Sequence, residues 1–416
     1  MTLSRRIFLR NGAMAIAGTS VIPSFLVRSV MAQTAAAASQ NKRLVVIFQR
    51  GAADGLNIVI PHGEPQYFAL RPTIAIPRER ILDLDGFFGL HPAMAPLLPM
   101  YRQGHLAVVH ATGSPDPTRS HFDAQDFMES GTPGVKSTTD GWLNRALQAE
   151  DERRRSQDRS PFRAIAVGNE APRTLAGPVH AMALNNLHDF SKLDRLDQSD
   201  GNLFQAMYDE SSNSLVQGAG REAFEAMQML RSTQPQNYTP APGADYPSSE
   251  FGRSLRQIAQ LLKGNFGVQV AFADVDGWDH HVNEGAEHGQ LANRLHDFSS
   301  SLAAFWTDLG PDADRTVVVT MSEFGRTVRE NGTGGTDHGH ANVMFAMGGA
   351  VRGGRVHGHW PGLAPEQLYQ RRDLAITTDF RQVLGEAAFK TVGASDLQRV
   401  FPGADLTSQS FLNVIA

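Results

Sequence analysis

Residues 255–349 alternate between helical and strand patterns, and this alternation constrains the fold more than any other feature of the chain. Leucine and phenylalanine recur at helical spacing over residues 291–305, and the β-branched run Thr316–Thr320 follows. A second apolar run covers residues 343–347. Amphipathic helices that alternate with short buried strands are typical of an α/β fold with a mostly parallel sheet. We therefore predict that fold class, and 416 residues are enough for one large domain of this kind.

The first part of the chain also contains apolar runs of strand length, but one segment of it differs. Residues 199–236 are polar and helical in pattern, without strand signals, which predicts an inserted helical segment. We therefore predict a single α/β domain over residues 42–416, with this helical insertion inside it. Further apolar runs predict strands over residues 42–48, 106–111, 162–167 and 266–275.

Polar side chains follow several predicted strands, at the point where each strand ends. Because ligands of open α/β sheets bind outside the carboxyl ends of the strands, we expect these side chains to meet. Acids and imidazoles without any cysteine are the ligand set of a hard or borderline divalent ion such as Zn, Mn, Ca or Mg, and we predict one or two such ions. The predicted metal ligands are Asp54, Asp279, His281, Glu323, Asp337, His338 and His340.

Each of these residues has a simpler interpretation. A solvated loop with capping acids explains any one of them, and Asp54 also fits an ordinary Asp-Gly turn. His280 and His281 are adjacent, so at most one of the two is expected to face the same ion. The prediction of a metal site therefore depends on the cluster as a whole.

Ser120 and His121 are the predicted catalytic residues. Turn formers precede Ser120 and a helical pattern follows it, which places its hydroxyl at a helix N-terminus, where the helix dipole favours an anionic substrate. The alternative is a plain helix cap. The nucleophile is left open between Ser120, His121 and a metal-bound water. The predicted substrate-binding residues are Arg50, Asn57 and Arg326, and the arginines either donate to a tetrahedral anion or form salt bridges.

The first 32 residues predict an export signal of the twin-arginine type. Arg5 and Arg6 precede a modest apolar stretch, and Val30-Met31-Ala32 is a small-residue cleavage signal. We expect the twin-arginine translocase to export the chain to the periplasm or beyond the cell, with residues 33–41 as a flexible mature N-terminus. The segment holds four arginines and no acid, so its loss changes the formal net charge from −5 to −9.

The composition also limits the kinds of partner and the location that we expect for this chain. The chain carries no basic stripe, so we expect no nucleic-acid partner. After residue 32 it has no run of the ~18–20 apolar residues that a membrane span needs, so we do not expect an integral membrane protein. The absence of cysteine fits an exported protein stabilised by its core and not by disulfides.

Several motifs occur in a specific order along the chain: Arg50–Gly55, His91–Pro92, Arg119–Phe122, Gly277–His281, Ser322–Thr327 and Asp337–Gly339. In this order they resemble an exported bacterial family, labelled domain of unknown function 1501, over residues 42 to about 390. That family is similar to the alkaline phosphatase and sulfatase superfamily. The resemblance implies an alkaline-phosphatase-like three-layer α/β/α sandwich, with metal ligands at strand ends and a nucleophile at a helix N-terminus.

The resemblance also implies roles for single residues. Asp54 resembles the first-strand metal ligand, Ser120 stands at the nucleophile position with His121 as its rival, and Asp279 with His281 resembles the Asp/His pair. Glu323 resembles the acid of the next strand, and His338 or His340 the last ligand. Two features depart from the superfamily: Phe324 replaces a histidine, and no cysteine is present to form a sulfatase formylglycine. A centre with one metal ion, or a degenerate site, therefore fits these residues as well as a centre with two metal ions.

Taken together, these features predict an exported metal-dependent hydrolase that acts on phosphate or sulfate esters of small molecules or polysaccharides. The alternative is a non-catalytic relic of the fold that binds a polysaccharide or a protein partner, which the phenylalanine at position 324 favours. A third possibility is a metal-dependent isomerase or phosphotransferase on the same fold.

Overall fold

The structure is a computed structural model of the whole chain, and it describes the domain but little of the N-terminal segment. The predicted export signal, the segment 33–41 and the insertion 199–236 lie outside the described residues, apart from short pieces. One of these pieces is an antiparallel pair formed by β1 (Leu9–Arg10) and β2 (Ala13–Met14). The described residues are 9–10, 13–14, 42–154, 160–168, 171–185, 187, 225–226, 229 and 237–416.

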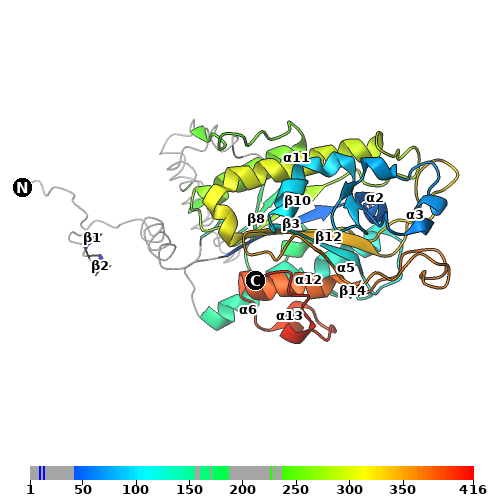
Figure 1. Ribbon diagram of the computed structural model, residues 1–416. Coiled ribbons are helices and arrows are strands. Elements are labelled where there is room, and N and C mark those ends of the chain that lie inside the picture. Colours follow the sequence, from blue (N-terminus) through cyan, green and yellow to red (C-terminus); the bar gives the residue numbers. More distant parts are fainter. Residues whose placement is uncertain are drawn as a thin grey trace, which may run out of the picture.

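A nine-stranded sheet forms the centre of the domain (Figure 1). Its strand order is β13-β7-β12-β11-β3-β10-β8-β9, with β14 paired to β7. Within this sheet only β12 runs antiparallel to its neighbours, so the prediction of a mostly parallel sheet is confirmed. The strands are β3 (Arg43–Gln49), β7 (Leu106–Gly113), β8 (Ala164–Val167), β9 (Met182–Leu184), β10 (Val270–Val275), β11 (Thr316–Met321), β12 (Asn342–Gly348), β13 (Val356–His357) and β14 (Thr378–Asp379).

The central strands are buried on both faces, which explains their continuous apolar runs. In β3, Val45 and Ile47 belong to one core, whereas Leu44, Val46 and Phe48 belong to the other. Successive side chains of a strand point to opposite faces, so each strand contributes to both cores. The result is the predicted three-layer α/β/α arrangement.

Helices cover the two faces of the sheet (Figure 1). One core contains residues of α4 (Leu98–Arg102), α10 (Glu250–Lys263) and α11 (Gln290–Leu309), and α11 runs along the top of the view. The other core contains residues of α6 (Trp142–Arg154), α12 (Phe380–Ala387) and α13 (Leu397–Val400), at the bottom of the view. Asp379 caps the N-terminus of α12, because its side chain accepts a hydrogen bond from Arg381 N.

Shorter elements complete the domain and include the helix that carries the Ser120-His121 motif. That helix is α5 (His121–Ser130). A small antiparallel sheet has the order β4-β6-β5. The remaining elements are α2 (Gly55–Ile58), α3 (Pro65–Leu70), β4 (Val59–Ile60), β5 (Leu82–Asp83), β6 (Gly89–Leu90), the 3-10 helices Arg78–Arg80, Pro92–Leu97, Arg173–Leu175, Gly310–Arg315 and Ser408–Ser410, and the π-helix Ala388–Val392.

The strand predicted over residues 266–275 starts later than the sequence indicates. β10 begins only at Val270. Asn265 and Gly267 both adopt positive φ angles, of 54° and 78°, which an extended strand does not permit. Phe266 and Val268 are nevertheless buried, so their apolar character reflects packing and not strand pairing.

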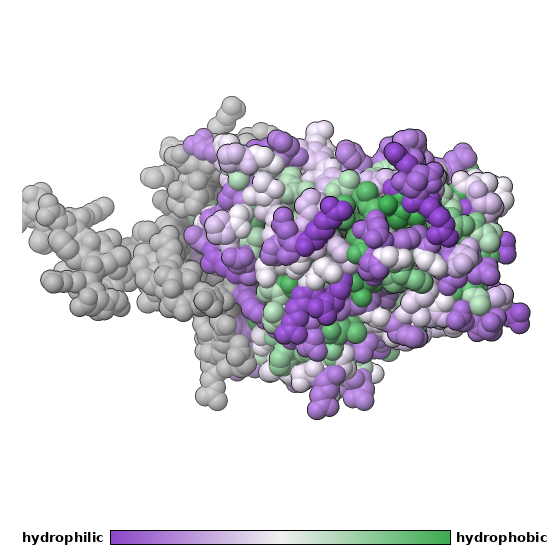
Figure 2. All heavy atoms as spheres, in the orientation of Figure 1, coloured by the Kyte–Doolittle hydropathy of each residue, from purple (hydrophilic) through white to green (hydrophobic). Residues whose placement is uncertain are grey.

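No helix among the described residues is long and apolar enough to cross a membrane. On the face that Figure 2 shows, apolar residues form small areas among hydrophilic ones.

Candidate metal centre

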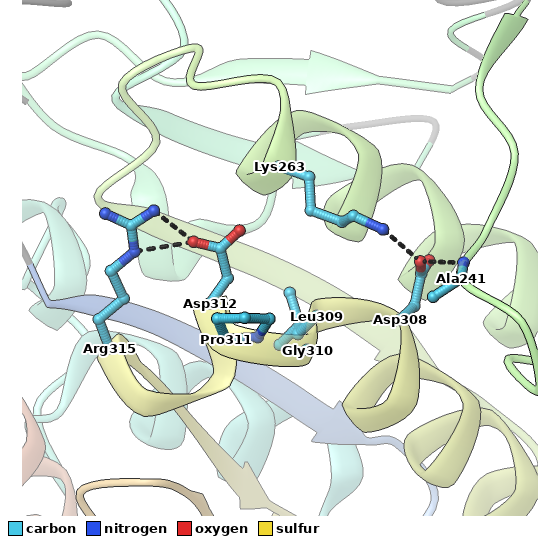
Figure 3. Close-up of a pocket in the computed structure, with 8 residues that line it drawn as sticks. All are labelled: Ala241, Lys263, Asp308, Leu309, Gly310, Pro311, Asp312 and Arg315. Carbon is cyan, nitrogen blue, oxygen red and sulfur yellow. Dashed lines mark hydrogen bonds and ion pairs between the residues drawn. The ribbon is translucent and has the colours of Figure 1, made fainter.

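The two ends of the sheet differ in what they offer to a ligand. At the amino-terminal end, a hollow of about 480 Å³ lies between α10, α11 and the start of β11 (Figure 3). Its charged side chains are paired with one another: Lys263 with Asp308 at 2.7 Å, and Arg315 with Asp312. Tyr238 and Tyr246 also donate to Asp308. The charged side chains of this hollow therefore already have partners of opposite charge.

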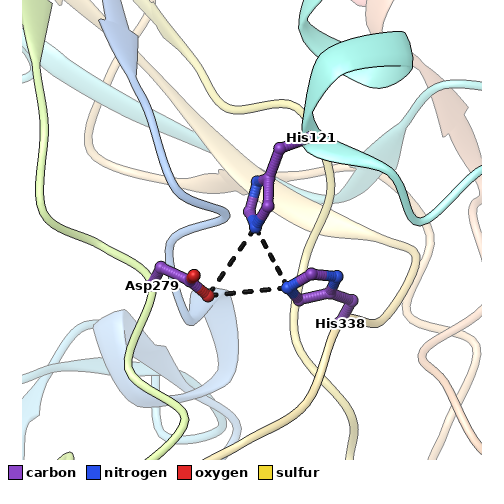
Figure 4. Close-up of side chains that lie close together, drawn as sticks. All are labelled: His121, Asp279 and His338. Carbon is purple, nitrogen blue, oxygen red and sulfur yellow. Dashed lines mark hydrogen bonds and ion pairs between the residues drawn. The ribbon is translucent and has the colours of Figure 1, made fainter.

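At the opposite end, three imidazole rings from three separate segments converge. Figure 4 shows two of these rings, His121 and His338, together with Asp279. His121 begins α5, His281 follows β10, and His338 lies in the loop between β11 and β12. The Nε2 atom of His338 lies 3.0 Å from Nε2 of His121 and 2.9 Å from Nε2 of His281. Oδ1 of Asp279 faces the same point. It lies 3.7 Å from Nε2 of His121, 3.0 Å from Nε2 of His281 and 3.5 Å from Nε2 of His338.

The other nitrogen of each ring contacts an oxygen acceptor. Nδ1 of His121 lies 2.8 Å from Oε1 of Glu323, and Nδ1 of His338 lies 2.8 Å from the carbonyl oxygen of Arg119. Nδ1 of His281 lies 3.2 Å from Oδ1 of Asp337. A ring nitrogen that faces an acceptor carries the proton, so these contacts leave a lone pair on each Nε2 atom.

Three convergent lone pairs repel one another unless a cation lies between them. Metal-binding histidines almost always donate their second ring N–H to a carboxylate or a backbone carbonyl, as all three rings do here. Donors of a tetrahedral ion with bonds of about 2.0–2.1 Å lie roughly 3.3 Å apart. The observed separations of 2.9 to 3.7 Å bracket that value. The ligand atoms of His121, Asp279 and His338 all lie within 4.8 Å of one another, so these three fit one divalent ion, and His281 lies beside Asp279 and His338 at 3.0 and 2.9 Å.

Asp279 is fixed by a buried arginine. Arg326 is 1% exposed and donates to Oδ1 of Asp279 at 2.5 Å. The same guanidinium donates to the carbonyl oxygens of Gly51 and Ala52, at 2.6 and 2.7 Å. Arg326 therefore connects the end of β3 to the loop after β10, and it holds the carboxylate toward the histidines.

Glu323 is fully buried and orients His121. Its Oε1 atom also accepts from the backbone N–H of Gly51 at 2.8 Å and from the side chain of Gln125 at 2.9 Å. Phe324 packs against the rings of both His121 and His338, with centroids 5.0 and 5.1 Å away. The residue that departs from the superfamily pattern thus forms an apolar wall beside two of the imidazoles.

The cluster is open to solvent on one side. The side chains of His121 and His338 are 25% and 24% exposed, and that of Asp279 is 46% exposed. Their anchors Glu323 and Arg326 are buried. A rigid inner layer with an accessible outer edge is the arrangement that a substrate-binding metal centre needs.

The local charges separate the pKa values of these groups. The hydrogen bond that His121 donates to Glu323 raises the pKa of His121, whereas burial lowers the pKa of His338. Burial opposes ionisation of Asp279, but the hydrogen bond and charge of Arg326 hold its pKa below the usual range. Such divergent shifts within a cluster of titratable groups are typical of functional sites.

Asp54 is not among the converging groups, although it was predicted as a ligand. Both of its carboxylate oxygens bind the guanidinium of Arg71, with Nη2 of Arg71 at 3.0 Å from Oδ1. Arg71 also donates to the carbonyl oxygens of Thr327 and Val328, at 2.8 and 2.9 Å. An internal arginine thus neutralises the carboxylate and occupies both of its oxygens.

Glu284 lies beside this ion pair and is also buried. Burial, together with the charge of the Asp54 carboxylate, raises the pKa of Glu284 well above its usual range. Asn57, predicted to bind substrate, is completely buried in the same network: it accepts from the hydroxyl of Tyr67 at 2.7 Å and donates to the carbonyl of Ile74. This network is buried beneath the loops of the site and supports them.

Two other predicted site residues have structural partners. His340 stacks on Tyr369 with ring centroids 4.1 Å apart, and no described hydrogen bond joins it to the cluster. Arg50 pairs with Glu129 and Asp274, both at 2.9 Å. The salt-bridge alternative is therefore correct for Arg50, and neither His340 nor Arg50 is a direct part of the centre.

Ser120 and His121 differ in their surroundings. Ser120 occupies the predicted N-cap position, but its side chain makes no capping bond and no described hydrogen bond to the cluster. His121 lies inside the cluster. Of the two adjacent histidines in the loop after β10, only His281 faces the convergence point, as expected, whereas His280 is buried and its pKa is lowered to about 4 by burial and nearby arginines.

Sequence reasoning missed four residues that shape the site: Arg71, Gln125, Glu284 and Arg372. Each is a common polar residue without a motif around it. Arg372 donates to the carbonyl oxygen of His338 at 2.9 Å and lies 3.7 Å from Oδ2 of Asp373, and its side chain is 42% exposed. It is therefore an accessible cation beside the histidines, contributed by a loop far away in the sequence.

Comparison with known proteins identifies a family but no activity. A family model described as "Protein of unknown function (DUF1501)" matches residues 41–400. No curated protein matches the chain. The solved PsFucS1 sulfatase from Pseudoalteromonas sp. shares 13% identity at a TM-score of 0.42, with 95% of this chain and 77% of that chain covered.

Two further solved structures have a similar chain path. The C-terminal periplasmic domain of EcEptC from Escherichia coli, in complex with Zn, shares 10% identity at a TM-score of 0.37, with 74% of this chain and 73% of that chain covered. An alkaline phosphatase superfamily protein from Vibrio parahaemolyticus shares 12% identity at a TM-score of 0.33, with 76% and 62% covered. Similarities this low assign no function to this chain.

Proposed function

Because this chain belongs to the family of proteins of unknown function DUF1501, we propose a function from its own site: an exported hydrolase of phosphate or sulfate esters that uses one divalent metal ion. The observation that carries the proposal is the convergence of three Nε2 atoms whose Nδ1 partners are all acceptors. Zn fits this nitrogen-rich donor set best among the ions that the sequence predicts.

The proposed ligands are His121, His281, His338 and Asp279. When bound, a divalent ion would polarise an ester oxygen and lower the pKa of water. Glu323 and Asp337 act through the rings: each accepts the Nδ1 proton of a ligand and fixes the tautomer. Arg326 positions Asp279 and is too buried to bind substrate itself.

One ion fits the residues better than two. A second ion near β3 would need Asp54, but Arg71 occupies both oxygens of that carboxylate. Phe324 supplies no donor atom at the position where the superfamily has histidine. The fully buried guanidinium of Arg71 already provides the positive charge that Asp54 requires.

Arg372 is the residue that we propose to bind the charged group of the substrate. It is the exposed cation next to His338, and arginine binds tetrahedral anions through paired N–H groups. We expect Arg372→Ala to raise KM for an anionic ester about tenfold or more, with an unchanged metal content. Steady-state kinetics with metal analysis of both proteins measures this effect. An unchanged KM would remove Arg372 from the substrate site.

A panel of aryl phosphate and aryl sulfate esters tests the activity directly. The exported protein is assayed after loading with Zn, Mn, Ca or Mg, and again after chelation. Turnover that depends on the added metal supports the proposal. A folded, metal-loaded protein that hydrolyses neither class of ester would contradict it.

A second candidate function is a metal-binding protein that has lost catalysis and binds a polysaccharide or a protein partner. It is favoured by Ser120, whose hydroxyl has no described hydrogen bond to the cluster. The ester panel separates the two candidates: this relic would bind the ion stoichiometrically but show no metal-dependent turnover.

Export is part of the proposal. Residues 5 and 6 are the adjacent arginines of the predicted twin-arginine signal. We expect the double variant Arg5→Lys/Arg6→Lys to accumulate as full-length precursor in the cytoplasm. Fractionation of cells followed by immunoblotting measures its location, and undiminished export of the double variant would contradict this route.

A further inference from the structure

A second cavity lies at the carboxyl ends of β8 and β10, on the same side of the sheet as the metal centre. Its volume is about 730 Å³, within the range of about 300–1,000 Å³ that is typical of ligand pockets. Residues of α10 form one wall, and the segment 171–173 forms another. The charged side chains that line it are Arg50, Arg173, Glu250, Arg253, Asp274 and Asp276.

A short chain of hydrogen bonds connects this cavity to the metal centre. Arg50, in the cavity wall, donates to Gln125 at 3.1 Å. Gln125 donates to Glu323, and Glu323 holds His121. Asp276, also in the wall, precedes the proposed ligand Asp279 by three residues. The cavity therefore adjoins the centre and is not a separate surface feature.

The charges of the cavity are balanced or paired. Arg50 is neutralised by Glu129 and Asp274, and Arg173 pairs with Asp126. Three charged residues of the wall form no ion pair with another described residue, namely Arg253, Glu250 and Asp276. One such cation against two such acids gives no net attraction for a polyanion.

Uncharged polar groups complete the wall. The side chains of Asn185 and Ser254 form no hydrogen bond with another described residue, and both line the cavity. Free carboxylates accept hydrogen bonds from hydroxyl groups, whereas amide and hydroxyl side chains both donate and accept. This mixture of donors and acceptors matches a ligand with many hydroxyl groups and no charge.

We propose that this cavity binds uncharged sugar residues that lie next to the ester group processed at the metal centre. The inference rests on the proposed hydrolase function for the role of the cavity, but the binding itself does not require the ion. It assigns the substrate as a largely neutral glycan with isolated phosphate or sulfate esters, and not as a densely charged polymer. The net charge of −9 expected after export also disfavours a polyanion.

Calorimetric binding of neutral oligosaccharides of glucose, mannose and N-acetylglucosamine to the exported protein tests the proposal, with dextran sulfate as the polyanion. We expect at least one neutral ligand to bind, with an affinity that is unchanged between about 0.05 and 0.5 M salt. Ser254→Trp, which fills the cavity, and Asp276→Ala, which removes an acceptor, should each weaken binding at least tenfold. Arg256→Ala is the control, because Arg256 lies on α10 but does not line the cavity.

A parallel measurement separates this proposal from the hydrolase function. The His338→Ala protein should still bind the oligosaccharide, because the cavity does not contain that residue. Sugar binding without any metal-dependent turnover would support the cavity and refute the hydrolase. Failure of every neutral oligosaccharide to bind at millimolar concentration would overturn the cavity proposal, as would salt-sensitive binding of dextran sulfate alone.

Discussion

Replacing His338 with alanine is expected to release the metal ion and to reduce ester hydrolysis by about a thousandfold or more. Nε2 of His338 is the atom that lies within 3.0 Å of both other imidazole nitrogens, so its loss opens the centre of the donor set. His338 is only partly buried, and the variant should therefore keep its fold. Initial rates on the best ester of the panel, together with circular dichroism, measure both effects.

The chain offers a matched control two residues away. His340→Ala removes an imidazole from the same loop, but His340 stacks on Tyr369 and does not reach the cluster. We expect it to retain the ion and most of the activity. Glu323→Gln should be intermediate, with metal affinity about 10- to 100-fold weaker, because it disturbs only the partner of His121. Equal losses in His338→Ala and His340→Ala would refute this assignment of ligands.

Replacing Arg71 with methionine is expected to lower the free energy of unfolding by about 3–5 kcal/mol. Arg71 and Asp54 are 0% and 2% exposed, so the variant leaves a buried carboxylate without its counter-ion. Glu284 lies beside the same carboxylate and supplies no positive charge to replace that of Arg71. Urea denaturation of both proteins near neutral pH, at one fixed metal concentration, measures the loss.

A second variant separates loss of charge balance from loss of packing. Arg71→Met/Asp54→Asn removes both charges and should recover part of the stability of the single variant. Arg80→Ala, which breaks the exposed pair with Glu287, is the control and should leave stability unchanged. A loss below about 1 kcal/mol for Arg71→Met would contradict the buried ion pair as a major source of stability.

The sheet was predictable because its strands are buried on both faces. Runs such as Leu44–Phe48 in β3 and Thr316–Thr320 in β11 contain no charged residue, so the sequence marks them directly. The late start of β10 was not predictable from hydrophobicity, because Phe266 and Val268 are apolar for packing reasons. The positive φ angles of Asn265 and Gly267 decide that boundary.

The site was predictable only as a region. Strand ends identify Asp279, His281 and His338 as neighbours, but hydrogen-bond partners decide which groups are free to bind an ion. The sequence predicts a catalytic role for His121 and a metal-ligand role for Asp54. In the structure, His121 lies in the cluster of imidazoles, whereas the carboxylate of Asp54 binds the guanidinium of Arg71. Nothing in the local sequence of Arg71 indicates that partner.

Metal analysis of the exported protein, purified without chelators, tests the proposed one-metal centre. We expect one equivalent of a divalent ion per chain in the wild-type protein and in His340→Ala, and none in a folded His338→Ala variant. Wild-type protein without metal, or with the same metal content as a folded His338→Ala variant, would contradict it.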